Sequence, residues 1–374
     1  MNNLLESLID DFRKMYDAKF WELKESTYES WWEGTLGRPL IHIARHPHDL
    51  EYKPGVQKYQ RFWPYYREGL SIDSMLIAMI NDMNHMRCYG DGFPHRFPQF
   101  GAGVLAQMLG AESKNISGTV WFEPPDEISL GSRDLNLIRS EGSSYALIYE
   151  IYERMAEVFP SGLVQIGMTD IGGSADILNS FSPAGVLLMD LYDKPEMVKD
   201  QLKRVHSAWR EVFFSYAKIL NRFSPGYTCW TPMLSKKSYY MLQCDLAYMI
   251  GPVMFEEFIL EELKESSELL ERPFYHLDGK GQLAHLDMIL SIERLKGIQW
   301  IPGEGSPPLS EWPEVFRKIS DAGKKIQLFW NPDDDPFLLD KIADQIGRAD
   351  NICVVWADTY RNQSSVDELL GRFL

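Results

Sequence analysis

The chain contains 374 residues, of which 45% are hydrophobic and 13% aromatic, and it carries a formal net charge of −16. This negative charge repels a phosphate backbone at long range and argues against nucleic acid as a partner. No uncharged apolar run reaches the roughly 18 residues that a membrane span requires, so the sequence predicts no membrane-spanning segment and no membrane partner.

The N-terminal stretch MNNLLESLIDDFRKMYDAKFWELKE is amphipathic and acidic, which is typical of a folded helix rather than a signal peptide. The four cysteines, Cys88, Cys229, Cys244 and Cys353, form neither a CxxC pair nor a regular framework. Reduced thiols are therefore predicted, rather than disulfides or a zinc ribbon. Together these features predict a cytoplasmic protein.

Short apolar runs, rich in β-branched and aromatic residues, alternate with helical patterns along the chain. The clearest helix begins near Asp193, a candidate N-cap, with Pro195 in its first turn. The eight runs span residues 39–45, 119–124, 163–170, 227–232, 273–279, 297–305, 325–330 and 352–358.

Continuous apolar strands are typical of a parallel sheet that helices cover on both faces. Eight of them predict an α/β fold of the (β/α)8 TIM-barrel type, with an open doubly wound sheet as the alternative. Extra helices are expected at the N-terminus and, within the long connection 51–117, over the barrel mouth. No repeat or linker marks a boundary, so residues 1–374 are predicted to form a single domain.

In such a barrel the active site lies at the C-terminal ends of the strands. His276 and Asp278 are two residues apart on one run, so their side chains should point to the same side. We predict that His276, Asp278 and Asp170 are catalytic, whereas His285 and Asp287 belong to the following helix. The predicted substrate-binding residues are Arg45, Glu304 and five tryptophans that would wall an aromatic pocket or simply fill the core: Trp121, Trp230, Trp300, Trp330 and Trp356.

The segment HIARHPH offers a second interpretation, because it places His42, His46 and His48 around the end of the first run. This pattern resembles the metal-dependent amidohydrolase barrels, in which His276 and Asp358 would take two further metal-ligand positions. No histidine follows the sixth run and no lysine ends the fourth, so the likeness is partial.

Several segments in order resemble the uroporphyrinogen decarboxylase superfamily. They are FGAGVLAQMLGAE, TVWFEPPDE, GMTDIGGSADIL, LLMDLYDKPEMVKDQL, QCDLAYMIGPVMFEEFILEELK, FYHLDGKGQLAHLDMILSIERLKGIQWIPGEG and AGKKIQLF, and they span roughly Pro98 to the C-terminus. The resemblance implies a (β/α)8 barrel. It also implies either decarboxylation in porphyrin biosynthesis or methyl transfer involving corrinoids or thiols.

The decarboxylase branch resembles this chain less well, because only Arg45 remains near the arginine motif that would grip a tetrapyrrole bearing many carboxylates. Zinc-binding members of the methyltransferase branch carry a histidine, one residue and then a cysteine, and this chain has His276, Leu277 and Asp278. A second zinc cysteine of that branch would fall where Asp358 stands. Two carboxylates in place of thiolates would make a harder site.

The resemblance therefore implies an enzyme that moves a methyl group from a small methylated or methoxylated compound to a corrinoid protein. The resemblance allows two cofactors, a corrinoid carried by that partner protein and a divalent metal. It also implies a homodimer, which is common in the family. Decarboxylation of a porphyrinogen and a non-catalytic ligand-binding barrel stay as alternatives.

Overall fold

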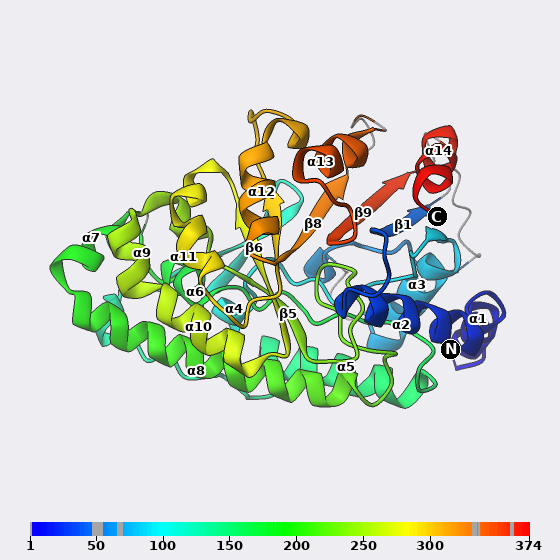
Figure 1. Cartoon of the computed structure of the whole chain (residues 1–374). Helices are drawn as coiled ribbons and strands as arrows, with labels where there is room; N and C mark the ends of the chain where they lie inside the picture. The colour runs from blue at the N-terminus through cyan, green and yellow to red at the C-terminus, as the bar shows by residue number, and fades with distance from the viewer. Residues whose placement is uncertain are drawn as a thin grey trace.

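The computed structural model of the chain describes residues 2–46, 55–65, 70–183, 185–330, 335, 337–359 and 363–374. Its central feature is a mostly parallel, seven-stranded sheet with helices on both sides (Figure 1). The sheet order is β2-β1-β9-β8-β7-β6-β5, and only β2 runs antiparallel to its neighbour, β1. Its strands are β1 (Leu40–His46), β2 (Arg87–Gly90), β5 (Tyr239–Gln243), β6 (Arg272–Asp278), β7 (Gly297–Ile301), β8 (Lys325–Trp330) and β9 (Ile352–Thr359).

The long helix α8 runs along one side of the sheet, and α12 and α13 lie on the other (Figure 1). Within the described part of the chain, none of the helices has the length and apolarity that crossing a bilayer would demand. The helices are α1 (Asn2–Met15), α2 (Ala18–Trp32), α3 (Ile72–Asn84), α4 (Leu105–Met108), α5 (Ser144–Val158), α6 (Ser174–Asn179), α7 (Val186–Asp193), α8 (Pro195–Leu220), α9 (Pro252–Phe258), α10 (Leu260–Leu269), α11 (Leu286–Leu290), α12 (Pro313–Asp321), α13 (Leu338–Ile346) and α14 (Gln363–Phe373).

The predicted eight-stranded barrel is not confirmed, because the hydrogen-bonded ladder has two edges, β2 and β5. Three irregular segments make single backbone contacts instead: Asp91 N donates to Ile41 O at 2.7 Å, Gly167 N to Arg96 O at 2.9 Å and Met168 N to Thr228 O at 2.9 Å. These contacts link segments around residues 91–96, 166–168 and 228 without forming a ladder.

The predicted strand 163–170 contributes only an isolated bridge at Ile166. One reason is that side-chain oxygens take two of its backbone N–H groups. Ile166 N donates to Ser224 Oγ at 3.3 Å and Thr169 N to the Tyr152 hydroxyl at 2.8 Å. A strand whose donors are taken in this way has fewer left to pair with a neighbour.

Two other predicted strands are also corrected. The run 119–124 forms β4 (Thr119–Glu123), which pairs with β3 (Glu112–Ile116) in a separate antiparallel hairpin. Its two-residue turn has positive φ at both Ser117 and Gly118, 51° and 82°, as tight hairpins of this length favour. The run 227–232 keeps only the bridge between Tyr227 and Ser235, and the strand that joins the sheet there is β5, which the sequence patterns missed.

A buried arginine at the start of β6, Arg272, fastens helix α2 to the sheet. The Arg272 guanidinium donates from Nη1 to Glu29 Oε1 at 2.5 Å and from Nη2 to Glu29 Oε2 at 2.8 Å. It also lies 4.9 Å from the ring centroid of Trp32 on α2. A fork-to-fork pair with an aromatic cover is a strong and directional contact.

The substitution Glu29→Ala should lower the free energy of unfolding by about 2 kcal/mol, because the buried Arg272 guanidinium loses its bidentate carboxylate and keeps a single carboxylate contact, with Glu33 Oε1 at 3.0 Å. Urea denaturation followed by circular dichroism measures the change. Glu22→Ala, at an exposed position of the same helix, is the control and should change stability by less than about 0.5 kcal/mol. Equal effects of the two substitutions would contradict this role for Arg272.

Candidate functional site

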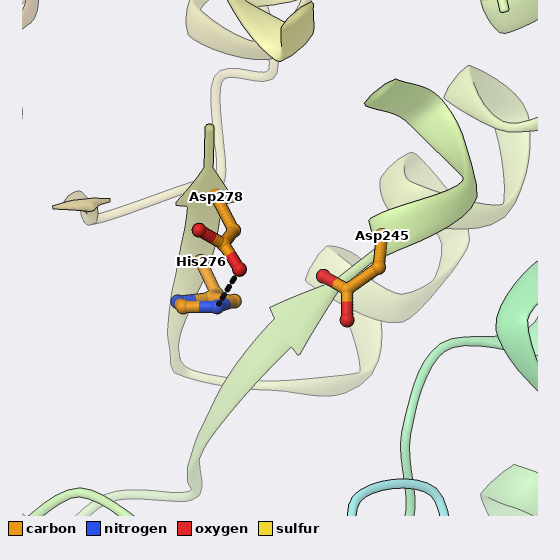
Figure 2. A group of neighbouring side chains, drawn as sticks. All are labelled: Asp245, His276 and Asp278. Atoms are coloured by element: carbon orange, nitrogen blue, oxygen red, sulfur yellow. Dashed lines mark ion pairs between the residues drawn. The ribbon is translucent and has the colours of Figure 1, made fainter. Parts of the chain in front are cut away.

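The end of β6 presents His276 and Asp278 on the same face of the sheet, as their spacing predicts. His276 Nε2 lies 3.7 Å from Asp278 Oδ2, and Figure 2 shows the two side chains one above the other on the strand. In the parallel ladder His276 stands between Gln243 of β5 and Gln299 of β7. The C-terminal ends of parallel strands are where α/β folds build ligand sites.

Asp245 is the third member of this cluster, and sequence reasoning missed it. It begins the short 3-10 helix η3 (Asp245–Met249) that follows β5, and it extends toward His276 and Asp278 (Figure 2). One ligand atom from each of Asp245, His276 and Asp278 lies within 4.8 Å of the other two. The sequence does contain a pattern that could have identified Asp245. The apolar run YYMLQ is followed by Cys244 and Asp245, and the recognised strands show the same apolar run with a polar end.

Asp176 of α6 fixes the start of η3. Its carboxylate accepts hydrogen bonds from Asp245 N at 2.9 Å and from Leu246 N at 2.7 Å. Burial, followed by the nearby Asp245, raises the pKa of Asp176 to about 7. The backbone of Asp245 is therefore held by the half-buried carboxyl group of Asp176, and the Asp245 side chain is left to face His276.

Two buried glutamine side chains, Gln299 and Gln327, orient His276 through a chain of hydrogen bonds. His276 Nδ1 is hydrogen-bonded to Gln299 Oε1, and Gln299 Nε2 donates to Gln327 Oε1 at 2.6 Å. Because Gln299 presents its carbonyl oxygen, His276 must carry a proton on Nδ1, which leaves Nε2 directed toward Asp278. This arrangement, in which one ring nitrogen is held by an acceptor and the other faces the site, is common in histidine metal ligands.

The electrostatics of the site are set by two carboxyl groups, those of Asp245 and Asp278, that lie close to the His276 imidazole. Burial lowers the pKa of His276, but the adjacent Asp278 carboxylate and the charge of Asp245 outweigh it and raise the pKa above its ordinary value. Burial raises the pKa of Asp245, against the opposing charge of His276. The cluster thus holds more negative charge than one imidazolium offsets.

Asp170, predicted as catalytic, lies beside this cluster. Its Oδ1 accepts hydrogen bonds from Gly172 N at 3.0 Å and Gln243 Nε2 at 3.4 Å. Burial raises the pKa of Asp170 to about 6, and the charge of Asp245 adds to the shift. Asp170 is therefore a carboxyl group that can give or take a proton near neutral pH.

The three clustered residues form a donor set that suits a divalent cation. One imidazole nitrogen and two carboxylates are ligands for Zn²⁺, Mn²⁺ or Fe²⁺, and the absence of thiolate makes the set harder than a zinc–sulfur site. Ligands about 2.1 Å from one ion lie at most about 4.2 Å apart, so a group spread over 4.8 Å would contract slightly to bind it. The residues fit such an ion in type and in place.

A cavity of about 360 Å³ opens beside the cluster. Asp245, Asp278 and Glu304 contribute carboxylates to its wall, and Lys280 is the cation among its described lining residues. Tyr248 closes one side by packing on two glycines: a Cβ at Gly279 would lie 2.9 Å from its ring, and one at Gly281 2.7 Å. The volume is near the lower end of the range for small-ligand sites.

Of the five predicted tryptophans, the structure brings Trp230 to His276. Their ring centroids are 5.1 Å apart at an interplanar angle of 87°. Trp300 follows Gln299 on β7 and so faces the opposite side, where it packs against Trp312. Trp121 is 59% exposed on the β3–β4 hairpin.

The remaining predicted pocket residues also lie elsewhere. Trp330 and Trp356 are register partners whose rings stack at 5.5 Å, on the face opposite Gln327 and Gln299. The Arg45 guanidinium carbon lies 5.7 Å from the Trp356 ring centroid. The predicted wall of five tryptophans with Arg45 is therefore not formed around His276, whereas Glu304 does line the cavity.

The histidines of the amidohydrolase interpretation are engaged elsewhere. His42 is buried, with Nδ1 3.1 Å from the Tyr28 hydroxyl, and burial lowers its pKa well below the ordinary value. His46 Nε2 lies 3.3 Å from Asp82 Oδ1. Neither residue joins the cluster of Asp245, His276 and Asp278. His48 and the side chain of Asp358 lie outside the described part of the chain.

Comparison with known proteins gives a likeness in fold. No family model matches the sequence, and no curated protein matches it either. Among solved structures, a methyltransferase from Methanosarcina mazei superimposes with a TM-score of 0.58 at 11% sequence identity. The match covers 93% of this chain and 97% of the other. At this identity the comparison establishes similarity of fold.

The substitution Asp278→Asn should lower the pKa of His276, because it removes the charge and acceptor that hold the imidazolium. NMR titration of the His276 Cε1–H signal, in protein treated with a chelator, measures the shift. In the wild type this ion pair stabilises the fold below the ordinary histidine pKa, and the contribution is lost as pH rises through the raised pKa. Asp287→Asn, which breaks only an exposed pair with Lys318, is the control; an unchanged titration in Asp278→Asn would contradict the assignment.

The substitution Gln299→Leu should weaken the binding of Zn²⁺ or Mn²⁺ by about 10- to 100-fold, because His276 loses the acceptor that fixes its tautomer. Isothermal titration of the chelator-treated protein measures the affinity. Gln299→Glu keeps an acceptor at the same place and should retain binding. Similar losses in both variants would show that packing, rather than the hydrogen bond, is responsible.

Proposed function

We propose that this chain is an enzyme that transfers the methyl group of a small methylated or methoxylated compound, with the cobalt of a corrinoid protein as acceptor. Asp245, His276 and Asp278 are proposed to hold a divalent cation at the cavity mouth. The observation that carries the proposal is this cluster, which stands at neighbouring strand ends beside a cavity of about 360 Å³. The fold likeness to a methyltransferase supports it.

In this proposal the bond between the methyl carbon and an oxygen breaks, and the bonding electrons stay on the oxygen. The reduced corrinoid supplies the electron pair for the new bond to carbon, and a proton neutralises the leaving oxygen. A bound cation would polarise that oxygen as a Lewis acid. Asp170 would supply the proton, since its pKa of about 6 leaves part of it protonated near neutral pH.

The other residues would position the substrate. Gln299 holds His276 in one tautomer, Asp176 holds the backbone of Asp245, and Trp230 stands edge-on to the imidazole as an apolar wall. Tyr248 restricts the opening on its side. Such positioning keeps the reacting groups in line without reorganisation.

The same cavity makes porphyrinogen decarboxylation the weaker alternative. A substrate with many carboxylates needs several cationic partners, because an unpaired buried charge costs several kcal/mol. The cavity instead carries three carboxylates against Lys280, and Arg45 stacks on Trp356 rather than near His276. Within the proposal the chain thus resembles the methyltransferase branch of the uroporphyrinogen decarboxylase superfamily.

The activity test uses purified protein loaded separately with Zn²⁺, Mn²⁺ and Fe²⁺, methanol or methoxybenzene as methyl donor, and chemically reduced cobalamin as a surrogate acceptor. Methyl transfer should appear as the change in the cobalamin spectrum and as the demethylated product. His276→Ala should reduce the rate on the order of 10²-fold or more, while Asp287→Asn should match the wild type.

Three results would count against the proposal. Release of carbon dioxide from a porphyrinogen would favour the decarboxylase alternative. Cation binding without turnover of any donor would favour a ligand-binding barrel. Equal rates in wild type and His276→Ala would remove the cluster from the chemistry.

A further inference from the structure

A second and larger cavity, of about 940 Å³, lies at the opposite pole of the sheet. Its wall is built from residues at the starts of the parallel strands. Arg272 opens β6, Lys296 and Lys324 directly precede β7 and β8, and Asn351 precedes β9. Parallel strands bring these positions to one edge, as they bring Asp245 and His276 together at the other.

The charge of this cavity opposes that of the protein. The chain as a whole carries a net −16, yet the wall holds seven cationic side chains against three carboxylates. Four of the cations are paired with nearby acids: Arg272 with Glu29 and Glu33, Lys237 with Glu33, Arg294 with Glu268, and Arg348 with Asp350. Lys296, Lys324 and Lys325 form no ion pair with a carboxylate among the described residues.

Burial and nearby positive charges lower the pKa values of two of these lysines, Lys324 and Lys325. Burial, and then the charge of Lys296, lowers the pKa of Lys324. Burial lowers the pKa of Lys325 to about 8, with Arg348 and Arg272 contributing and Asp350 opposing. Burial and the neighbouring cations therefore disfavour the charged form of Lys324 and Lys325, and a bound anion would stabilise that form.

Part of this charge has a structural use. Lys324 Nζ donates to the carbonyls of Ile292, Glu293 and Leu295 at 2.9, 3.2 and 2.7 Å, just beyond α11. Lys325 Nζ donates to Trp31 O and lies 4.2 Å from the Trp31 ring centroid. The exposed Lys296 has neither kind of contact among the described residues, although it stands on the same wall. Carbonyl contacts thus account for Lys324 and Lys325, and Lys296 is the cation of this wall that keeps no ion pair or carbonyl contact among the described residues.

We propose that this cavity binds a small multivalent oxyanion, a pyrophosphate or a phosphate ester of nucleotide size. Its volume lies within the range of small-molecule sites, and its guanidinium and ammonium groups are the donors that phosphate oxygens prefer. Trp32, Glu33 and Gly34 from the end of α2 also line it. The anion would therefore bridge the N-terminal helices and the sheet, and would stabilise the folded chain.

The test measures pyrophosphate binding to the full chain by isothermal titration and by the shift in melting temperature, at constant ionic strength. Lys296→Gln should weaken binding by about tenfold, since it removes one charged donor at an exposed position where folding is not at stake. Lys203→Gln on α8 and Lys280→Gln at the other cavity remove the same charge elsewhere and should leave affinity unchanged.

Citrate and adenosine triphosphate serve as further probes, because they separate recognition of carboxylates from recognition of phosphates. Tighter binding of pyrophosphate or the nucleotide than of citrate supports the proposal. Binding no stronger than that of sulfate, or a loss that is equal in Lys296→Gln and Lys203→Gln, overturns it. Either result is independent of methyl transfer, because no residue of the His276 cluster is involved.

Discussion

The candidate site depends on the register of the parallel strands β5 to β8. That register sets Gln243, His276, Gln299 and Gln327 side by side on one face of the sheet. A shift of a single residue in β6 would turn His276 toward the helical side and bring Leu277 into the row. The apolar neighbours Tyr275 and Leu277, both buried on the other face, hold the register against that shift.

Hydrogen bonds between neighbouring members stabilise a row of buried polar groups. Here the amide chain from Gln327 through Gln299 ends on His276, while Asp176 satisfies the backbone at Asp245. The hydrogen bonds between the strands therefore fix the orientation of the His276 imidazole. The half-buried carboxyl group of Asp176 fixes the backbone of Asp245 in the same way. The cluster is formed before any ligand arrives, which reduces the cost of ordering it on binding.

Sequence patterns predicted β1 and β6 to β9, because each is a continuous apolar run, and they placed His276 and Asp278 at a strand end. They missed Asp245 because β5 was passed over for the run at 227–232, whose backbone turns back at Ser235. They also assigned Trp300 to the pocket, since a strand end alone does not say which face a residue occupies. The adjacent Gln299 and Trp300 must face opposite sides, and only the partners in space decide which one meets His276.

The two poles of the sheet differ in charge for a physical reason. Helices that return to the start of the next strand leave their last carbonyls at that edge, which favours cations such as Lys324 there. The opposite edge is free of those carbonyls, so Asp245, Asp278 and Glu304 can gather around a cavity without meeting the basic wall. With Asp278 in the position two residues after His276, the acidic pole offers oxygen ligands rather than sulfur. A cation held there would act more strongly on an oxygen of the substrate than on a thiol, which is why the proposed donor is a methylated oxygen.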